Sequence, residues 1–429
     1  MKKSLAERDQ EIIWHPFSKL NTGVLPIEIV KAKGVYIYDS TGKKYIDAIS
    51  SWWVNLHGHN HPKIVKAIAN QTKKIDHVIF DGFTHESAIA LAEGLLSVLP
   101  INLKKVFYSD DGSTAVEVAL KMAFQYFYNT KKPKKYIIAF EGAYHGDTFG
   151  GMSVGDRTVF NKPFEKHLFE VLHIPIPNAK DKGKSLEKFK SVVTKHKNNI
   201  AAFIYEPLVQ GAAGMRIYPK DELESILNYC TQKEILKIAD EVMTGFGRTG
   251  KYFASDYLKN KPDVICLSKG ITGGVLPLGA TVCTKKIFDA FVSQKNDTHI
   301  RTFFHGHSYT ANPISCAAAV ASLNLLKSKS TRKNIERISK QHTAFAKEIS
   351  KNNRVVNAKS LGTICSIEIK AEQSTGYLNP LREELYPYFI SQGILLRPLG
   401  NVIYILPPYS ISNAELKKVY RAIREFLLR

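Results

Sequence analysis

The stretch LKIADEVMTGFGRTGKYFASDYLKNKPDVICLSKGITGGVLPLGA, residues 236–280, carries the pattern that decides the fold. Two strand-like apolar runs, ILKIAD at 235–240 and DVICLS at 263–268, each lead into a Gly-rich segment. Asp240 ends the first run and Lys269 follows the second. Because ligands bind at the carboxyl ends of strands in an open α/β sheet, we expect both side chains to project into one crevice.

Comparable β-rich runs recur along the chain and alternate with stretches of helical periodicity. They are VFYS at 106–109, YIIAF at 136–140, AAFIY at 201–205 and ATVCT at 280–284. Between them, apolar residues recur at the spacing of one helix face, as in Val118, Met122 and Tyr126. Strands separated by helices indicate an α/β domain with a mainly parallel sheet.

The two ends of the chain differ from this centre. Residues 26–50 alternate apolar and polar positions around a Ser40-Thr41-Gly42 turn, which predicts a small antiparallel meander. Near the C-terminus, Ser412 and Glu415 have the spacing of a capping box ahead of a final helix. The strand-like runs before that helix are 364–370, 394–398 and 402–406. The predicted parts are an N-terminal segment with the meander (1–60), a large α/β domain (61–325) and a small α+β C-terminal domain (326–429).

The composition limits the possible classes of protein. With 429 residues, of which 44% are hydrophobic, the chain is too apolar to be disordered. Its net charge of +21 would suit a nucleic-acid-binding protein, but the lysines are scattered and belong to no recognisable binding module. We therefore expect no nucleic-acid partner.

The cysteines and the apolar runs of the sequence indicate in which cellular compartment the protein is expected. The five cysteines are widely spaced without a C-x-x-C pair, which indicates reduced thiols inside a cell. Neither a signal-peptide run nor a stretch of about 18 apolar residues is present. The expectation is a cytoplasmic protein with no membrane partner.

Asp240 and Lys269 together suit one cofactor, pyridoxal phosphate. Taken singly, an Asp after a strand is more often a helix cap, and a Lys before Gly is usually solvated. Pyridoxal phosphate needs a lysine amine for its Schiff base, a carboxylate that keeps its ring nitrogen protonated, and a phosphate cradle. The pair therefore predicts the first two of these three groups.

A candidate phosphate cradle lies at the start of a predicted helix. The run VFYS leads into Asp110-Asp111-Gly112-Ser113-Thr114. Backbone N–H groups at a helix N-terminus, approached through Gly112 and supplemented by the Ser113 hydroxyl, form an anion site. The segment also fits a capping box of Thr114 with Glu117, and both roles can coexist.

Two further turns contain aromatic or histidine residues. Tyr144, in EGAYHGD at 141–147, either stacks on a flat heteroaromatic ring or packs at a Gly-rich turn. His57, His59 and His61 alternate in HGHNHP, but no Cys or carboxylate ligand pattern accompanies them. We therefore predict no metal site.

The stretch 236–280 resembles the cofactor-attachment signature of the subgroup III pyridoxal-phosphate-dependent aminotransferases, which are fold-type I enzymes. The resemblance implies a large domain with a mainly parallel seven-stranded sheet and a small α+β domain. It implies that Lys269 forms the Schiff base and acts as general base in a ping-pong transamination. It also implies that Asp240 pairs with the pyridine nitrogen.

The same resemblance extends to the other candidate residues. The Gly-Ser pair that binds the phosphate in that family corresponds to Gly112 and Ser113. Tyr144 matches the catalytic-site aromatic that lines the cofactor and substrate pocket, and Asp147 is close by in sequence.

The segment FFHGHSYTANP, 303–313, resembles the part of the family that crosses the dimer interface. This likeness implies a homodimer with shared active sites, in which Gly306, His307 and Ser308 reach the partner subunit's site. Ser308 would give a hydroxyl to the phosphate, where many relatives have Thr.

Further stretches resemble the branch of the family that aminates 8-amino-7-oxononanoate in biotin biosynthesis. They are WHPF at 14–17, SSWW at 50–53, YHGDTFGGMSVGD at 144–156, EPLVQGAAGMRIYP at 206–219 and ILLRPLGNVIYILPPY at 394–409. The resemblance implies that Trp52, with Trp53 beside it, packs on the alkyl chain and that Arg397 binds the terminal carboxylate. An apolar wall and one distant guanidinium suit such a substrate, because Arg meets a carboxylate with a bidentate fork. Phe17 stands where many members have a Tyr that takes part in substrate recognition.

Two alternatives stay open at this point. The amino donor is S-adenosylmethionine in most of the family and lysine in some members. Another ω-amino acid transaminase of the subgroup, acting on ornithine, 4-aminobutyrate or β-alanine, would share every cofactor residue.

Overall fold

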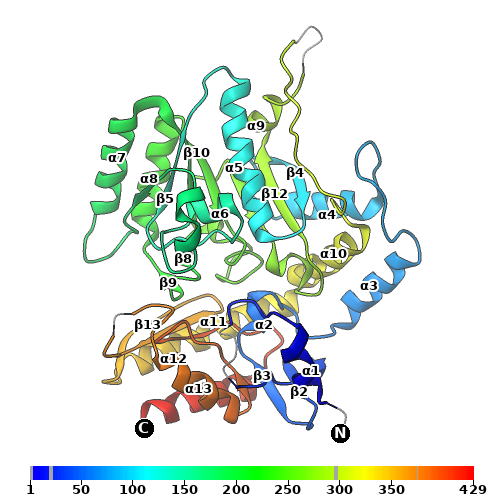
Figure 1. Ribbon diagram of the computed structural model, residues 1–429, viewed down its shortest axis with the longest axis vertical. Coiled ribbons are helices and arrows are strands. Elements are labelled where there is room, and N and C mark those ends of the chain that lie inside the picture. The colour runs from blue at the N-terminus through cyan, green and yellow to red at the C-terminus, as the bar shows by residue number, and fades with distance from the viewer. Residues whose placement is uncertain (1–2, 19–22, 294–297, 374) are drawn as a thin grey trace.

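A seven-stranded sheet with the order β4-β12-β11-β10-β7-β5-β6 forms the centre of the larger part of the molecule (Figure 1). The computed structural model describes residues 3–18, 23–293, 298–373 and 375–429. The strands are β4 (Leu103–Ser109), β5 (Tyr136–Phe140), β6 (Val171–Ile174), β7 (Ile200–Tyr205), β10 (Leu236–Asp240), β11 (Val264–Leu267) and β12 (Gly279–Thr284). Only β12 runs antiparallel to its neighbours, so the predicted mainly parallel sheet is confirmed. Strand β6 was not predicted; it is short, half-buried and lies at the edge of the sheet.

Both faces of this sheet are buried, which explains the continuous apolar runs of its strands. In β5, Ile137 packs with helix α5 (Gly112–Asn129) on one face, whereas Ile138 belongs to the core on the other face. The helices on that second side are α4 (Glu86–Leu96), α7 (Lys184–His196), α8 (Lys220–Gln232) and α10 (Pro313–Lys327). The carboxyl ends of the parallel strands meet the lower part of the molecule in Figure 1.

Helix α5 begins differently from the prediction. Its N-cap is Asp111, whose carboxylate accepts from the Thr114 N–H at 2.8 Å, while Thr114 Oγ1 accepts from the Asp111 N–H at 3.1 Å. The predicted capping box of Thr114 with Glu117 is therefore wrong. Because the helix starts at Gly112, Glu117 lies further along it and instead accepts from the Gly150 N–H at 2.6 Å.

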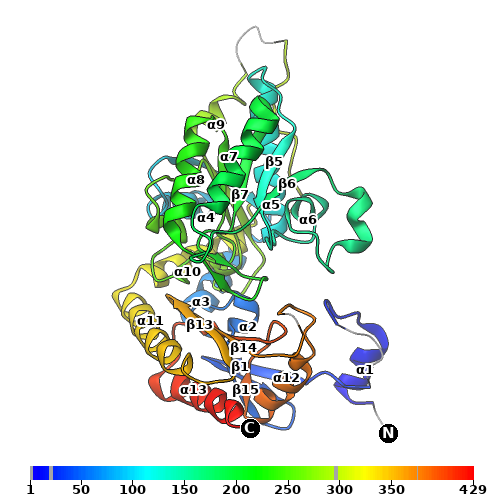
Figure 2. The same cartoon turned by 90° about the vertical axis from the view of Figure 1, so that its left-hand side faces the viewer.

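Two smaller sheets form the lower part of the molecule, with the C-terminal helices packed beside them (Figure 2). The predicted meander is present as β1 (Ile29–Lys33), β2 (Tyr36–Asp39) and β3 (Lys44–Asp47), and β15 (Ile394–Leu395) joins it parallel to β3. The other sheet is antiparallel and comprises β13 (Val355–Leu361), β14 (Ile364–Ile369) and β16 (Val402–Ile405). Residues from both ends of the chain thus share one sheet, and the domain boundaries at 60 and 325 stay predictions.

The other helices and strands are distributed over both parts of the molecule (Figure 1). The final helix α13 (Asn413–Leu427) begins with the predicted capping box of Ser412 and Glu415. The remaining helices and strands are α1 (Leu5–Ile12), α2 (Ser50–Trp53), α3 (Pro62–Thr72), α6 (Phe149–Val154), α9 (Lys285–Asp289), α11 (Lys329–Ile349), α12 (Leu381–Ser391), β8 (Val209–Gln210) and β9 (Arg216–Ile217). Within the described ranges, no helix is both long enough and apolar enough to cross a membrane.

Candidate active site

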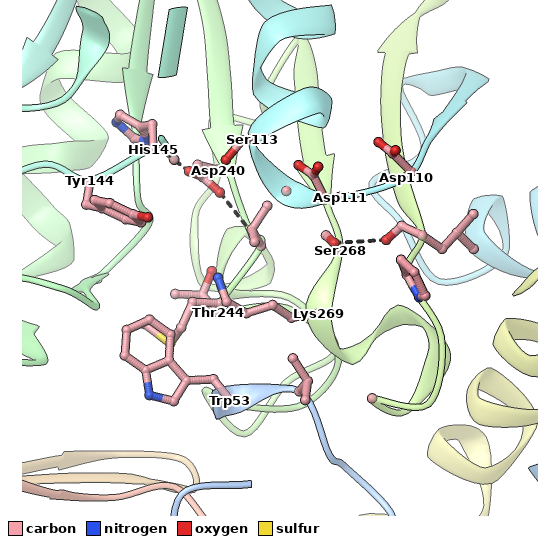
Figure 3. A pocket seen from close by; sticks show the side chains of 18 of the residues that line it. Trp53, Asp110, Asp111, Ser113, Tyr144, His145, Asp240, Thr244, Ser268 and Lys269 are labelled. Atoms are coloured by element: carbon pink, nitrogen blue, oxygen red, sulfur yellow. Dashed lines mark hydrogen bonds and ion pairs between the residues drawn. The ribbon is translucent and has the colours of Figure 1, made fainter. Parts of the chain in front are cut away.

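A cavity of about 460 Å³ lies at the carboxyl ends of β4, β10 and β11 (Figure 3). Asp240 is the last residue of β10, and Lys269 follows β11 at the start of a short 3-10 helix. Both line this cavity, together with Gly112, Ser113 and Tyr144. The structure therefore brings together residues separated by more than a hundred positions in the sequence.

Two neighbours fix the Asp240 carboxylate. His145 Nδ1 lies 2.7 Å from Asp240 Oδ2, and the backbone N–H of Val242 donates to Oδ1 at 3.0 Å. Both Asp240 and His145 are buried, and His145 Nε2 has no hydrogen-bond partner among the described residues. His145 was not predicted as a site residue, although it directly follows Tyr144 at the exit of a strand.

Lys269 is half-buried, and its amine lies 5.3 Å from the centre of the Trp53 indole. Burial lowers the pKa of this amine, while Asp240 and Glu206 act in the opposite direction. No carboxylate of the described residues lies within ion-pairing distance of its Nζ. Its backbone φ of 45° is left-handed, a strain of about 1–3 kcal/mol for a non-glycine residue that folded proteins tolerate chiefly at functional sites. Lys269 thus presents an unpaired amine of lowered basicity to the cavity.

The N-terminus of α5 can hold an anion at the same cavity. A Cβ on Gly112 would lie 2.7 Å from Val242 Cγ1, so the close approach of the two segments requires glycine. Ser113 Oγ accepts from the Asp147 N–H at 3.2 Å and keeps its own proton to donate. The Asp110 and Asp111 carboxylates both accept from Thr114. The helix N-terminus and the hydroxyl therefore supply the donors for an anion.

Tyr144 and Glu206 complete the wall next to Asp240. The Tyr144 hydroxyl donates to Asp147 Oδ2 at 2.8 Å, and burial raises the pKa of this phenol. Glu206, which was not predicted as a site residue, accepts from the N–H groups of Tyr144 and Gly211. Burial raises the pKa of Glu206 to about 7. Its signal in the sequence was its position directly after the buried strand β7.

A second cavity of about 320 Å³ adjoins the first, because Trp53, Tyr144 and Lys269 line both. The predicted substrate residues Phe17, Trp52 and Arg397 line this second cavity. Its other lining residues, none of them predicted, are Phe160, Ala212, Tyr377 and Leu399.

Arg397 and the tryptophans are held by their neighbours. The Arg397 guanidinium lies 4.4 Å from the centre of the Trp52 ring, and Phe17 meets the same ring edge-on at 5.5 Å. Trp53 is buried and donates from Nε1 to the Tyr404 hydroxyl at 3.0 Å. The second cavity is therefore an aromatic slot with a guanidinium at its wall.

Asp147 lines neither of these two cavities. It borders a third cavity of about 370 Å³, which shares Tyr144 and Phe160 with the aromatic slot.

Gly306, His307 and Ser308 line none of the three cavities within one chain. His307 Nε2 lies 3.9 Å from Asp110 Oδ1, while Gly306 and Ser308 are exposed. Two large neighbours, Phe304 and Tyr309, are exposed by 74% and 65%.

The three histidines of HGHNHP each serve a different contact. His57 lies 3.1 Å from Ser322 Oγ, His59 lies 2.9 Å from Asp47 Oδ2, and His61 accepts at the start of α3. The three histidines therefore contact three separate parts of the protein.

Comparisons with known proteins agree with this geometry. The family model described as aminotransferase class-III matches residues 17–427. An adenosylmethionine-8-amino-7-oxononanoate aminotransferase of Synechococcus elongatus is 46% identical over 97% of this chain and 98% of its own length. A protein of the same name from Staphylococcus aureus is 37% identical over 99% of this chain and 97% of its own.

Solved structures show the same fold. The crystal structure of adenosylmethionine-8-amino-7-oxononanoate aminotransferase from Methanocaldococcus jannaschii has a TM-score of 0.92 at 35% identity and covers 98% of both chains. An amine transaminase from an uncultivated Pseudomonas species, in its PLP-bound form, has a TM-score of 0.90 at 29% identity over 96% of this chain and 97% of that one. Matched over nearly its whole length in sequence and in structure, the chain belongs to the class-III aminotransferases.

Proposed function

We propose that this aminotransferase uses pyridoxal phosphate to convert 8-amino-7-oxononanoate into 7,8-diaminononanoate in biotin biosynthesis. The observation that carries the proposal is the aromatic slot, which joins the cavity of Lys269 and has Arg397 at its wall. The names of relatives that are 36–46% identical support the same substrate.

The residues of the first cavity fit pyridoxal phosphate. Lys269 would hold the cofactor covalently, Asp240 would face its ring nitrogen, Tyr144 would stack on its ring, and the donors at Gly112 and Ser113 would hold its phosphate. When bound, the cofactor acts as an electron sink that makes the carbon bearing the transferred amine acidic.

Two side chains of the protein control protons in this site. The lowered pKa of Lys269 increases the fraction of neutral amine, which suits both a nucleophile and a general base. Asp240, with its two oxygens fixed by His145 and Val242, is oriented to keep a proton on a ring nitrogen in front of it.

The aromatic slot fits the oxo acid. Trp52 and Phe17 would exclude water from its alkyl chain, and Arg397 would bind its carboxylate. Phe17 offers only apolar surface where a tyrosine would offer a hydroxyl. We infer that the donor is S-adenosylmethionine, because the names of the relatives contain adenosylmethionine, with lysine as the other candidate.

We further infer a homodimer in the cytoplasm. The exposed Phe304 and Tyr309 flank the segment of Gly306, His307 and Ser308, as expected of a surface that a second copy covers. The five cysteines are buried thiols without a disulfide, which suits a reducing compartment.

The test is turnover by the protein loaded with pyridoxal phosphate. With S-adenosylmethionine or lysine as donor, we expect 8-amino-7-oxononanoate to yield 7,8-diaminononanoate by mass spectrometry. Lys269→Ala should abolish turnover, since no other described lysine lines the cavity. Failure to aminate this oxo acid, combined with rapid amination of 4-oxobutanoate or glutamate semialdehyde, would contradict the proposed substrate.

A further inference from the structure

The Arg397 guanidinium carries an uncompensated charge beside the aromatic slot. It stacks on Trp52 and donates from Nη2 to the Tyr377 hydroxyl oxygen at 3.1 Å, and no carboxylate among the described residues pairs with it. Both neighbours are neutral, so they fix the planar group without cancelling its charge. Such a group is suited to bind an anion that comes from outside the chain.

Tyr377 is itself firmly held, although it precedes α12 in a segment without regular structure. Its ring meets Phe160 edge-on at 4.8 Å and lies 5.2 Å from the Arg382 guanidinium. Two residues before Tyr377 in the chain, Thr375 Oγ1 accepts a hydrogen bond from Asn401 Nδ2 at 3.3 Å. The hydroxyl that meets Arg397 thus belongs to a ring with packed neighbours.

We propose that Tyr377 is a positioning residue that aims the Arg397 fork at the carboxylate of an aliphatic oxo acid. The inference rests on the proposed function and adds a specificity-determining residue to it. The Tyr377 hydroxyl accepts from one edge of the guanidinium and restricts its rotation on the Trp52 face. The remaining N–H groups of Arg397 are then oriented for a bidentate contact with the carboxylate.

The experiment measures binding of an inert probe, nonanoate, by calorimetry to the protein loaded with pyridoxal phosphate. Nonanamide, which has the same chain without the charge, is the matched ligand. We expect Tyr377→Phe to weaken nonanoate binding about fivefold to tenfold and to leave nonanamide binding unchanged, because a hydrogen bond to a charged group is lost. In turnover, the same variant should raise the KM for the oxo acid at nearly constant kcat.

Tyr386→Phe is the control variant. Tyr386 lies on α12 near Arg397, is 37% exposed, and lines none of the three cavities. The Tyr386→Phe variant should bind nonanoate with the same affinity as the unmodified protein.

A double-mutant cycle distinguishes positioning from a general structural effect. Lysine has a compact ammonium without a fork to orient, so Tyr377→Phe should change nonanoate binding less than twofold in the Arg397→Lys background. An equal loss in both backgrounds would overturn the proposal, as would an unchanged nonanoate affinity in Tyr377→Phe. If the expected binding pattern appears but 8-amino-7-oxononanoate is not aminated, the proposed substrate fails while the role of Tyr377 stands.

Discussion

At the scale of single residues, the candidate site places two buried carboxyl groups and one amine around a single cavity. Asp240 is buried beside a histidine, Lys269 has an unpaired amine, and Glu206 is buried with only backbone donors for its carboxylate. Burial lowers the pKa of the Lys269 amine and raises the pKa of the Glu206 carboxyl. Two groups with shifted pKa values at one cavity are typical of a catalytic site.

Glu206 gives a pH-dependent prediction. Its pKa is about 7 in the folded protein and near 4.5 when unfolded, so the folded state binds the extra proton between these values. Stability should therefore be highest at the acidic end of this window and fall as pH rises to about 7, with an upper limit of about 3 kcal/mol from this group.

Urea unfolding at several pH values between 4.5 and 7.5 measures the effect. Glu206→Gln keeps an oxygen that can accept from Tyr144 and Gly211 but removes the titration, so its stability should decline less over that range. Parallel stability profiles for the variant and the unmodified protein would contradict the prediction.

At the scale of elements, the N-terminus of α5 joins the fold to the site. The helix packs against the large sheet, and its first residue, Gly112, lies against Val242 two positions after Asp240. The close contact between Gly112 and Val242 therefore both positions the helix and shapes the site that would hold an anion.

Gly112→Ala should displace this helix start, because the added Cβ would lie 2.7 Å from Val242 Cγ1. We expect the affinity for pyridoxal phosphate to fall about tenfold, the loss of one charge-assisted hydrogen bond, measured by fluorescence titration. Gly94→Ala is the control, because Gly94 lies in α4 and lines none of the three cavities. A Cβ at this position would lie 2.9 Å from Leu323 Cδ2 in α10. Equal cofactor affinity of the two variants would argue against the cradle.

At the scale of the whole molecule, one chain leaves Gly306, His307 and Ser308 outside its own cavities. In the proposed homodimer these residues serve the partner's site. The proposal can be tested by subunit exchange, because each active site would take residues from two chains.

Lys269→Ala and a bulky variant, Ser308→Trp, should each be inactive as homodimers. After subunit exchange, a mixed dimer would contain one site with neither substitution, so equal mixing should restore about a quarter of the activity. No recovery despite mixed dimers seen by native mass spectrometry would show that Ser308 does not act across subunits.

The sequence by itself determined every strand of the large sheet except the edge strand β6, and it determined the convergence of Asp240 and Lys269. Those features depend on local patterns: apolar runs buried on both faces and polar residues where parallel strands end. Only the tertiary structure decided that His145 fixes Asp240, because their contact joins two strand ends far apart in sequence. It also decided the aromatic slot, which Phe17 near one end of the chain lines together with Tyr377 and Arg397 near the other. No local pattern encodes such contacts, since they arise from the packing of both chain ends into one part of the molecule.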